Sequence, residues 1–256
     1  MAFLLLFALP ALAEPEAPSG LVHEEGGLVV EIVDGDTVLL DDGREVRLVG
    51  LQAPKLPLGR PGFTEWPLAE AAWSALSGLV LERRIDLAYG GRRGDRHGRR
   101  LAHLIRDDGL WVQGAMLAAG MARVYSFPDN RPAVSEMLAI ERASRAARRG
   151  IWADPFYAVR RPAETHGLVD TFQVVEGRVL DAAEVRGRIY LNFGQNWRED
   201  FTVTIAPGDR RTFEEAGLEP AGWTGRRIRV RGWIGEYNGP VIDATHPEQV
   251  ELLEAE

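Results

Sequence analysis

Short runs rich in apolar and β-branched residues, separated by turn signals, begin at residue 28. The run at 29–33 ends in Asp34-Gly35-Asp36, and the run at 45–51 follows the turn sequence Asp41-Asp42-Gly43-Arg44. β-Branched residues bounded by Asp and Gly are typical of strands, and a short Asp-Gly loop between two of them predicts a hairpin. The predicted strands of this region are 29–33, 37–40, 45–51, 85–89 and 101–105.

Three segments among and after these strands carry apolar residues at helical spacing. The first, 67–79, opens with Pro67 and repeats apolar residues every three or four positions. The second, 111–119, is closed by Gly120, and the third, 132–149, is closed by Gly150. Strands followed by interleaved helices predict a small α+β domain over residues 28–155.

A second β-rich region follows a proline-containing linker, predicted at 156–170. Its predicted strands are 172–180, 188–193, 201–205, 226–234 and 241–242, with a short helix at 209–216. Five strands with one helix before the fourth are consistent with a second small β-barrel of the OB type. We therefore assign residues 171–256 to a second domain.

Arginine and apolar residues alternate within the fourth strand of this second region. Arg227, Arg229 and Arg231 fall on one face and Ile228 and Val230 on the other. Basic residues accompanied by aromatic side chains often hold single-stranded nucleic acid on small barrels. The alternative is an ordinary barrel with a solvated outer face.

The N-terminus has the pattern of an export signal. An apolar run at 3–12 ends in Ala11-Leu12-Ala13, which is the small-x-small pattern of a cleavage site. The run is shorter than the about 20 residues that a membrane span needs. We predict a signal peptide at 1–13, a polar leader at 14–27, and a periplasmic or secreted mature chain without a membrane span.

The composition of the chain restricts the kinds of ligand and site that it can have. Apolar residues make up 45% and charged residues 27% of the chain, as in soluble globular proteins. The formal net charge of -8 argues against a uniformly basic surface, but eight arginines gather in residues 83–106. Such a patch favours an anionic ligand, with a solvated surface loop as the alternative. The absence of cysteine excludes disulfides, thiolate metal sites and a cysteine nucleophile.

Three segments in order resemble the staphylococcal nuclease (thermonuclease) family. They are Val-Asp-Gly-Asp-Thr at 33–37, Val-Arg-Leu-Val-Gly-Leu-Gln-Ala-Pro at 46–54, and Asp-Arg-His-Gly-Arg-Arg-Leu-Ala at 95–102. Each segment alone is an ordinary turn or strand, whereas the ordered set is specific. The resemblance covers residues 28–155 and implies an OB-fold barrel with three helices.

The resemblance also implies a site for phosphodiester hydrolysis of DNA or RNA. Family members hold a calcium ion with carboxylates, use a glutamate as base, and clamp the phosphate with two arginines. On the matching positions Asp36 would be a metal ligand, with Asp34 supporting it, and Arg47 and Arg99 would be the clamps. Arginine suits this role because its planar guanidinium binds two phosphate oxygens and stays charged.

Further ligand contacts are implied at two places. Arg96 and His97 lie where the family places side chains near a terminal phosphate. Tyr125 and Phe127 lie near the family's aromatic residues beside the nucleobase, where they would stack on a base. Core packing is the alternative for one of the two aromatic residues.

Two positions depart from the family pattern. Gln52 stands where the family has its second metal carboxylate, and Lys55 stands where it has the glutamate base. A neutral amide weakens a calcium site, and a lysine is a base only if its pKa is strongly lowered. Lys55 could instead supply a fixed cation beside the phosphate.

Two functions therefore remain open from the sequence. The first is an exported thermonuclease-like protein that acts on DNA or RNA with an altered metal and base site. The second is a catalytically inactive module of the same fold that binds nucleic acid, nucleotide phosphate or an envelope protein partner. The retained residues Asp36, Arg47 and Arg99 favour an anionic ligand in both cases.

Overall fold

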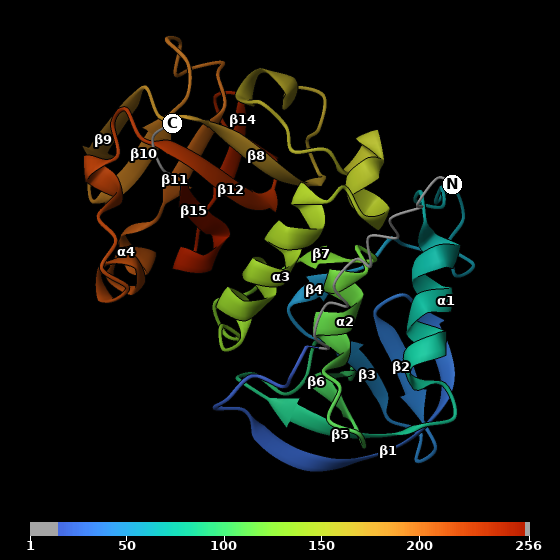
Figure 1. The fold of residues 1–256 in the computed structure, drawn as a ribbon. Coiled ribbons are helices and arrows are strands. Elements are labelled where there is room, and N and C mark those ends of the chain that lie inside the picture. Colours follow the sequence, from blue (N-terminus) through green and yellow to red (C-terminus); the bar gives the residue numbers. More distant parts are fainter. Residues whose placement is uncertain (1–14, 254–256) are drawn as a thin grey trace, which may run out of the picture.

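The computed structural model describes residues 15–253, so the predicted signal peptide at 1–13 lies outside the described residues. Figure 1 shows an N-terminal domain in blue to green and a C-terminal β-rich domain in orange to red. Among residues 15–253, no helix is both long and apolar enough to cross a membrane. The α+β class predicted from the sequence is confirmed.

The N-terminal domain is built on a closed barrel with strand order β1-β2-β3-β6-β5. Its strands are β1 (Val22–Asp34), β2 (Thr37–Leu40), β3 (Glu45–Leu48), β5 (Arg84–Tyr89) and β6 (Arg100–Arg106). The first half of β1, residues 22–28, pairs with β5, and the second half pairs with β2. The barrel thus begins at Val22, within the segment predicted as leader, because this stretch is needed to close it.

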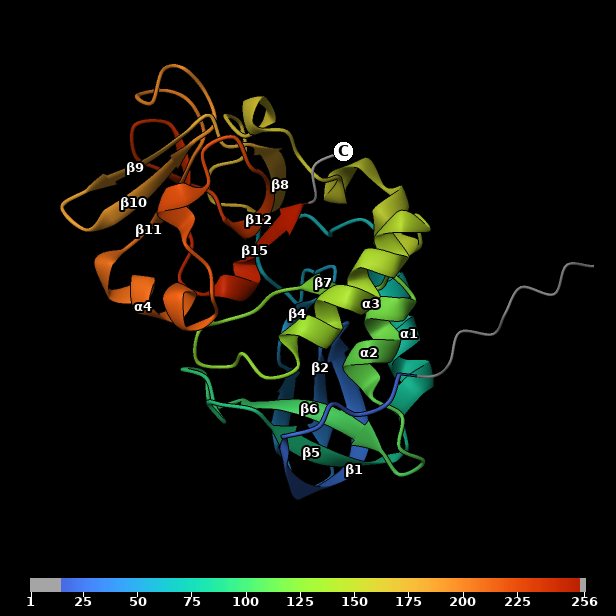
Figure 2. The same cartoon turned by 60° about the vertical axis from the view of Figure 1, so that its left-hand side comes forward.

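Three helices lie on one side of the barrel, and the third packs on the second rather than on the barrel, as Figure 2 shows. They are α1 (Ala69–Val80), α2 (Val112–Ala118) and α3 (Val134–Ala146), each lying within or near its predicted range. Ala69, Ala72, Leu76 and Val80 are the buried residues of α1, and their spacing puts them on one face. A short ladder joins β4 (Leu51–Gln52) to β7 (Arg123–Val124) beside the helices.

The C-terminal domain consists of two sheets around one core. A three-stranded sheet contains β15 (Val250–Leu253), β12 (Arg227–Trp233) and β8 (Phe172–Arg178). A five-stranded sheet contains β13 (Gly235–Glu236), β14 (Pro240–Asp243), β11 (Thr202–Ile205), β10 (Arg188–Asn192) and β9 (Asp181–Val185), and α4 (Pro207–Glu215) follows β11. The strand pattern missed β9, which contains two acidic residues and two alanines, and β15 near the chain end.

The predicted linker is packed against the protein. It contains two short 3-10 turns, Pro155–Tyr157 and Pro162–Glu164. Tyr157 is buried, and its hydroxyl donates a hydrogen bond to the carbonyl of Pro67 at 2.7 Å. The Arg160 backbone N–H donates to the Val174 carbonyl of β8, and its carbonyl accepts from the Glu176 N–H, both at 2.8 Å. The connection therefore holds the second domain against the first.

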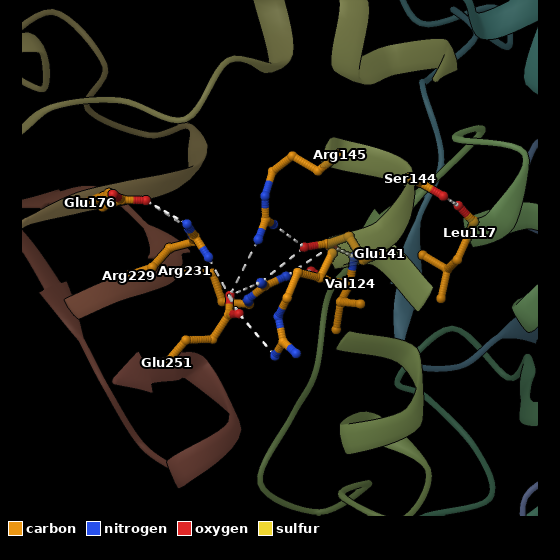
Figure 3. Close-up of polar contacts among 10 residues, drawn as sticks. Leu117, Val124, Glu141, Ser144, Arg145, Glu176, Arg229, Arg231 and Glu251 are labelled. Atoms are coloured by element: carbon orange, nitrogen blue, oxygen red, sulfur yellow. Dashed lines mark hydrogen bonds and ion pairs between the residues drawn. The ribbon is translucent and has the colours of Figure 1, made fainter. Parts of the chain in front are cut away.

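A buried ion-pair network joins the two domains (Figure 3). Arg231 of β12 donates to both carboxylate oxygens of Glu141 on α3 at 3.0 Å, and to Glu251 of β15 at 2.9 Å. All three side chains are buried. Burial alone would lower the pKa of Arg231, but Glu141 and Glu251 raise it above its ordinary value.

The same network corrects the interpretation of the alternating arginines. Arg229 donates to Glu176 at 2.6 Å, and Arg227 donates to Glu176 at 2.7 Å. The three arginines do share a face, but Arg227 and Arg229 pair with carboxylates of the same domain, and Arg231 alone reaches across to Glu141. These ion pairs favour a structural role for the arginine row over nucleic-acid binding.

Two buried histidines predict an acid-sensitive fold. Burial lowers the pKa of His103 to about 4, and burial likewise lowers the pKa of His246 to about 4. The unfolded chain binds these protons near pH 6.5. We therefore expect the free energy of unfolding to fall as the pH drops from 6.5 to 4, by up to about 3 kcal/mol for each histidine.

Urea unfolding at pH 7.5, 5.5 and 4.5 measures this loss. His103 accepts a hydrogen bond from the Trp111 indole at 3.2 Å, so His103→Gln supplies a neutral comparison that keeps a polar side chain. The variant should lose less stability than the parent over the same pH interval. Equal slopes for the two proteins would contradict the assignment to His103.

Candidate functional site

The turn between β1 and β2 aims two carboxylates into the protein. Asp34 and Asp36 are both buried, and the Asp34 carboxylate accepts a hydrogen bond from the backbone N–H of Asp36 at 3.0 Å. Gly35 between them has no room for a side chain: a Cβ would lie 2.8 Å from the Cβ of Ala53 and 2.9 Å from that of Ala72. The Asp-Gly-Asp sequence is therefore a close-packed corner with both acids facing inward.

Lys55 is bound directly to both of these acids. Its Nζ lies 2.6 Å and 2.7 Å from the two carboxylate oxygens of Asp36, and 3.0 Å from Oδ2 of Asp34. Arg47 of β3 donates from Nη1 to Asp36 Oδ1, and the backbone N–H of Ala53 donates to Asp36 Oδ2 at 2.8 Å. Every side-chain oxygen of Asp36 is thus engaged by a donor of this chain.

The two carboxyl groups respond differently to this environment. Burial alone would raise the pKa of Asp34, but the Lys55 ammonium and a hydrogen bond from Asp36 hold it well below its ordinary value. Burial raises the pKa of the more deeply placed Asp36, against the opposing attraction of Arg47 and Lys55. Lys55 and Arg47 therefore favour the ionised form of both carboxyl groups.

The residues of this corner do not fit a divalent cation. Calcium needs several oxygen ligands free to converge on it, whereas the Lys55 ammonium lies among the Asp34 and Asp36 oxygens. The Gln52 carbonyl accepts two hydrogen bonds from Arg123, at 3.0 Å and 2.7 Å. Within residues 15–253, no group of three or more His, Asp or Glu side chains could hold a metal. The metal-ligand role predicted for Asp36 therefore does not fit this arrangement.

A groove of about 690 Å³ opens beside the corner and is strongly basic. Five arginines and His97 line it, against two aspartates, Asp95 and Asp129. The arginines are Arg47, Arg60, Arg92, Arg96 and Arg99. The two clamps predicted from the sequence, Arg47 and Arg99, are thus brought to one groove from β3 and from the loop before β6.

Arg99 is held in place by Asp95. Its Nε and Nη2 lie 2.8 Å and 2.7 Å from Oδ2 of Asp95. Burial would raise the pKa of Asp95, but Arg99 and the backbone N–H groups of His97 and Arg99 lower it. An ionised Asp95 therefore orients the guanidinium without covering all of its donors.

Arg96 and His97, predicted to lie near a terminal phosphate, are exposed and line the groove. The Nε of Arg96 donates to the ring Nε2 of His97 at 3.1 Å. Arg60 and Arg92 were not among the predicted site residues. Arg92 belongs to the basic run at 83–106, so the sequence did contain a sign that it could bind an anion. Arg60 lies in a proline-rich loop, and the sequence does not define the path of that loop.

One end of the groove is aromatic. Tyr125 and Phe127 meet edge to face with ring centroids 4.8 Å apart, and Tyr125 also packs on Phe172. Trp233, from β12 of the second domain, lines the same groove and donates its indole N–H to the Tyr125 hydroxyl at 2.8 Å. Trp233 was not among the site residues predicted from the sequence.

A second cavity, of about 420 Å³, lies on the five-stranded sheet of the C-terminal domain. Tyr190, Trp197 and Tyr237 line it together with Asn192 and Asp181. The described residues that line this cavity include no lysine or arginine. Phosphate recognition is therefore better supported in the basic groove of the N-terminal domain.

Comparison with known proteins gives one family match and several relatives. Residues 45–154 match the model of a family described as staphylococcal nuclease homologue. The chain is 36% identical over 164 residues to Protein ParB of Escherichia coli, covering 60% of this chain and 86% of that protein. It is 30% identical over 131 residues to an uncharacterized endonuclease of Escherichia coli O157:H7, covering 50% and 77%. It is 29% identical over 137 residues to the thermonuclease of Staphylococcus intermedius, covering 51% and 78%.

Proposed function

Because the chain belongs to the staphylococcal nuclease family, we propose that it is an exported protein that binds nucleic acid in its arginine groove, with Lys55 in place of the family's calcium ion. The family supports a thermonuclease-like action on nucleic acid in general terms. The proposal adds that phosphate binding in this chain needs no divalent cation.

The contact between Lys55 and the two acids carries this proposal. Asp34 and Asp36 contribute two negative charges, and Lys55 and Arg47 contribute two positive charges at bonding distance. The corner is therefore balanced without a metal ion. Arg92 and Arg99 each pair with one aspartate but stay partly exposed in the groove. Their remaining donors can attract phosphate oxygens, which bind guanidinium groups through paired hydrogen bonds.

Phosphodiester hydrolysis is a second candidate function. It is favoured by the endonuclease relatives and by the convergence of Arg47 and Arg99 on one groove. Hydrolysis also needs a base for the attacking water. Asp95 and Asp129 are paired with arginines, and Glu65 and Glu70 are exposed and do not line the groove. His97 is the lining group left for that role.

Binding of a labelled single-stranded DNA and RNA, measured in calcium and in chelator, tests the proposed function. We expect equal affinity in the two conditions. Arg99→Ala should weaken binding and reduce the slope of log affinity against log salt by about 0.7, the value for one phosphate contact on a single strand.

Arg211→Ala is the matched control, because this arginine of α4 is 85% exposed and forms an ion pair with Glu215. It should bind as the parent does. Binding that requires calcium, or that Arg99→Ala leaves unchanged, would overturn the proposal. Strand cleavage in chelator that His97→Gln abolishes would establish the second candidate function.

Export is supported by the apolar run at 3–12 and the Ala-Leu-Ala sequence that follows it. Cleavage there leaves Glu14 as the first residue of the mature protein. N-terminal sequencing of the protein recovered outside the cytoplasm tests this, and an intact N-terminus would refute cleavage.

A further inference from the structure

The C-terminal domain contributes an aromatic side chain to the groove of the N-terminal domain. Trp233 is the last residue of β12, is 50% exposed, and lines the groove with Tyr125 and Phe127. We propose that Trp233 forms, with these two residues, a nucleobase subsite for single-stranded nucleic acid. The subsite rests on the proposed function, because it assumes that phosphates bind at the arginines of the same groove.

Trp233 is held in place by the domain interface. Arg231, two residues earlier on the same strand, is buried in the ion pairs with Glu141 and Glu251. Trp233 also pairs with Phe172 of β8, whose ring packs edge to face on Tyr125 at 4.8 Å. The interface is further tied by the Arg131–Glu248 ion pair at 2.9 Å. The indole therefore lies at a fixed position relative to the groove.

The chemistry of this end of the groove suits a base. The indole nitrogen, which is the only polar atom of the Trp233 side chain, donates to the Tyr125 hydroxyl at 2.8 Å, and half of the residue remains exposed. Phe127 is 45% exposed beside it. Exposed aromatic faces next to a row of arginines match a single strand, whose phosphates and bases can bind separately. A base within a duplex has no free face to stack on this wall.

A purely structural role is the competing explanation. Trp233 would then serve only to hold Tyr125 and to cover the interface. The two explanations differ in what they require of the ligand, since a nucleobase subsite acts only on a strand that carries bases.

The test compares oligothymidylate with an abasic strand of the same length, using the full chain in chelator. Wild-type protein should bind oligothymidylate more tightly than the abasic strand. Trp233→Ala should weaken oligothymidylate binding by about tenfold, as for loss of one stacked base, and leave abasic binding within about twofold. Trp233→Phe, which keeps a ring but loses the indole N–H, should restore most of the affinity.

Trp197→Ala is the matched control, since this tryptophan of the same domain is 51% exposed and lines the other cavity. It should leave both affinities unchanged.

The two affinities are compared within one variant, so partial unfolding lowers both equally and leaves their ratio unchanged. Equal weakening of both ligands by Trp233→Ala, or a phenylalanine variant as weak as the alanine variant, would overturn the subsite while leaving the proposed function intact. Wild-type protein that binds neither strand would overturn both.

Discussion

Replacing Arg231 with methionine is expected to lower the free energy of unfolding by about 3–5 kcal/mol, the usual cost of removing one partner of a buried ion pair. Methionine fills a similar volume but supplies no charge and no donors. Glu141 and Glu251 would then remain buried, and they would keep only their weaker or more exposed contacts with Arg142, Arg145 and Arg229 among the described residues. Urea unfolding at pH 7.5 measures the loss.

The lost free energy of unfolding should come from the buried carboxylates that no longer pair with Arg231. Neutralising one of these carboxylates should therefore recover part of the lost stability. The double variant Arg231→Met, Glu141→Gln is expected to be more stable than Arg231→Met alone. Arg211→Met, at an exposed arginine with an exposed partner, should change the free energy of unfolding by less than about 0.5 kcal/mol. A loss of less than about 1 kcal/mol for Arg231→Met would contradict the view that this network joins the domains.

The network also shows where prediction from the sequence stops. Alternation correctly placed Arg227, Arg229 and Arg231 on one face, because a strand has a fixed period of two. It could not reveal that Glu141, 90 residues earlier, pairs with Arg231. Ion pairs between distant segments depend on how the domains pack, and local sequence carries little information on that packing.

The barrel and its site were likewise predicted from the sequence only in part. The ordered segments at 33–37, 46–54 and 95–102 were enough to predict the fold and to bring Arg47 and Arg99 to one groove. The barrel start at Val22 was missed because closure depends on pairing with β5, which a single strand pattern does not show. Trp233 reaches the groove only through the docking of the second domain.

Gln52 and Lys55 were recognised as departures, but their consequences needed the structure. The Gln52 side-chain oxygen is not free to bind a metal ion, because it accepts two hydrogen bonds from the buried Arg123. Burial lowers the pKa of Arg123 to about 10, against small opposing effects from Tyr157 and Glu141. Its guanidinium lies 4.7 Å from the ring centroid of Phe172, so the altered position also takes part in the domain interface.

Replacing Lys55 with glutamate is expected to destabilise the protein by several kcal/mol in chelator, the range for an uncompensated buried charge, and to make its stability depend on calcium. The corner of Asp34, Asp36, Lys55 and Arg47 is electrically balanced in the parent. The substitution leaves three carboxylates against one guanidinium. A hard divalent cation can restore the balance and takes carboxylate oxygens as ligands.

Thermal unfolding with calcium and with chelator measures this dependence. If the new site has a Kd of about 1 mM, as in weak calcium modules, roughly 10 mM calcium should stabilise Lys55→Glu by about 1.4 kcal/mol. Lys55→Met is the matched control, because it removes the ammonium but adds no oxygen ligand, and its calcium response should be smaller. The parent should show none. A parent protein that calcium stabilises would mean that calcium displaces the Lys55 ammonium from Asp34 and Asp36, and the metal-free phosphate site would then be the wrong description of this groove.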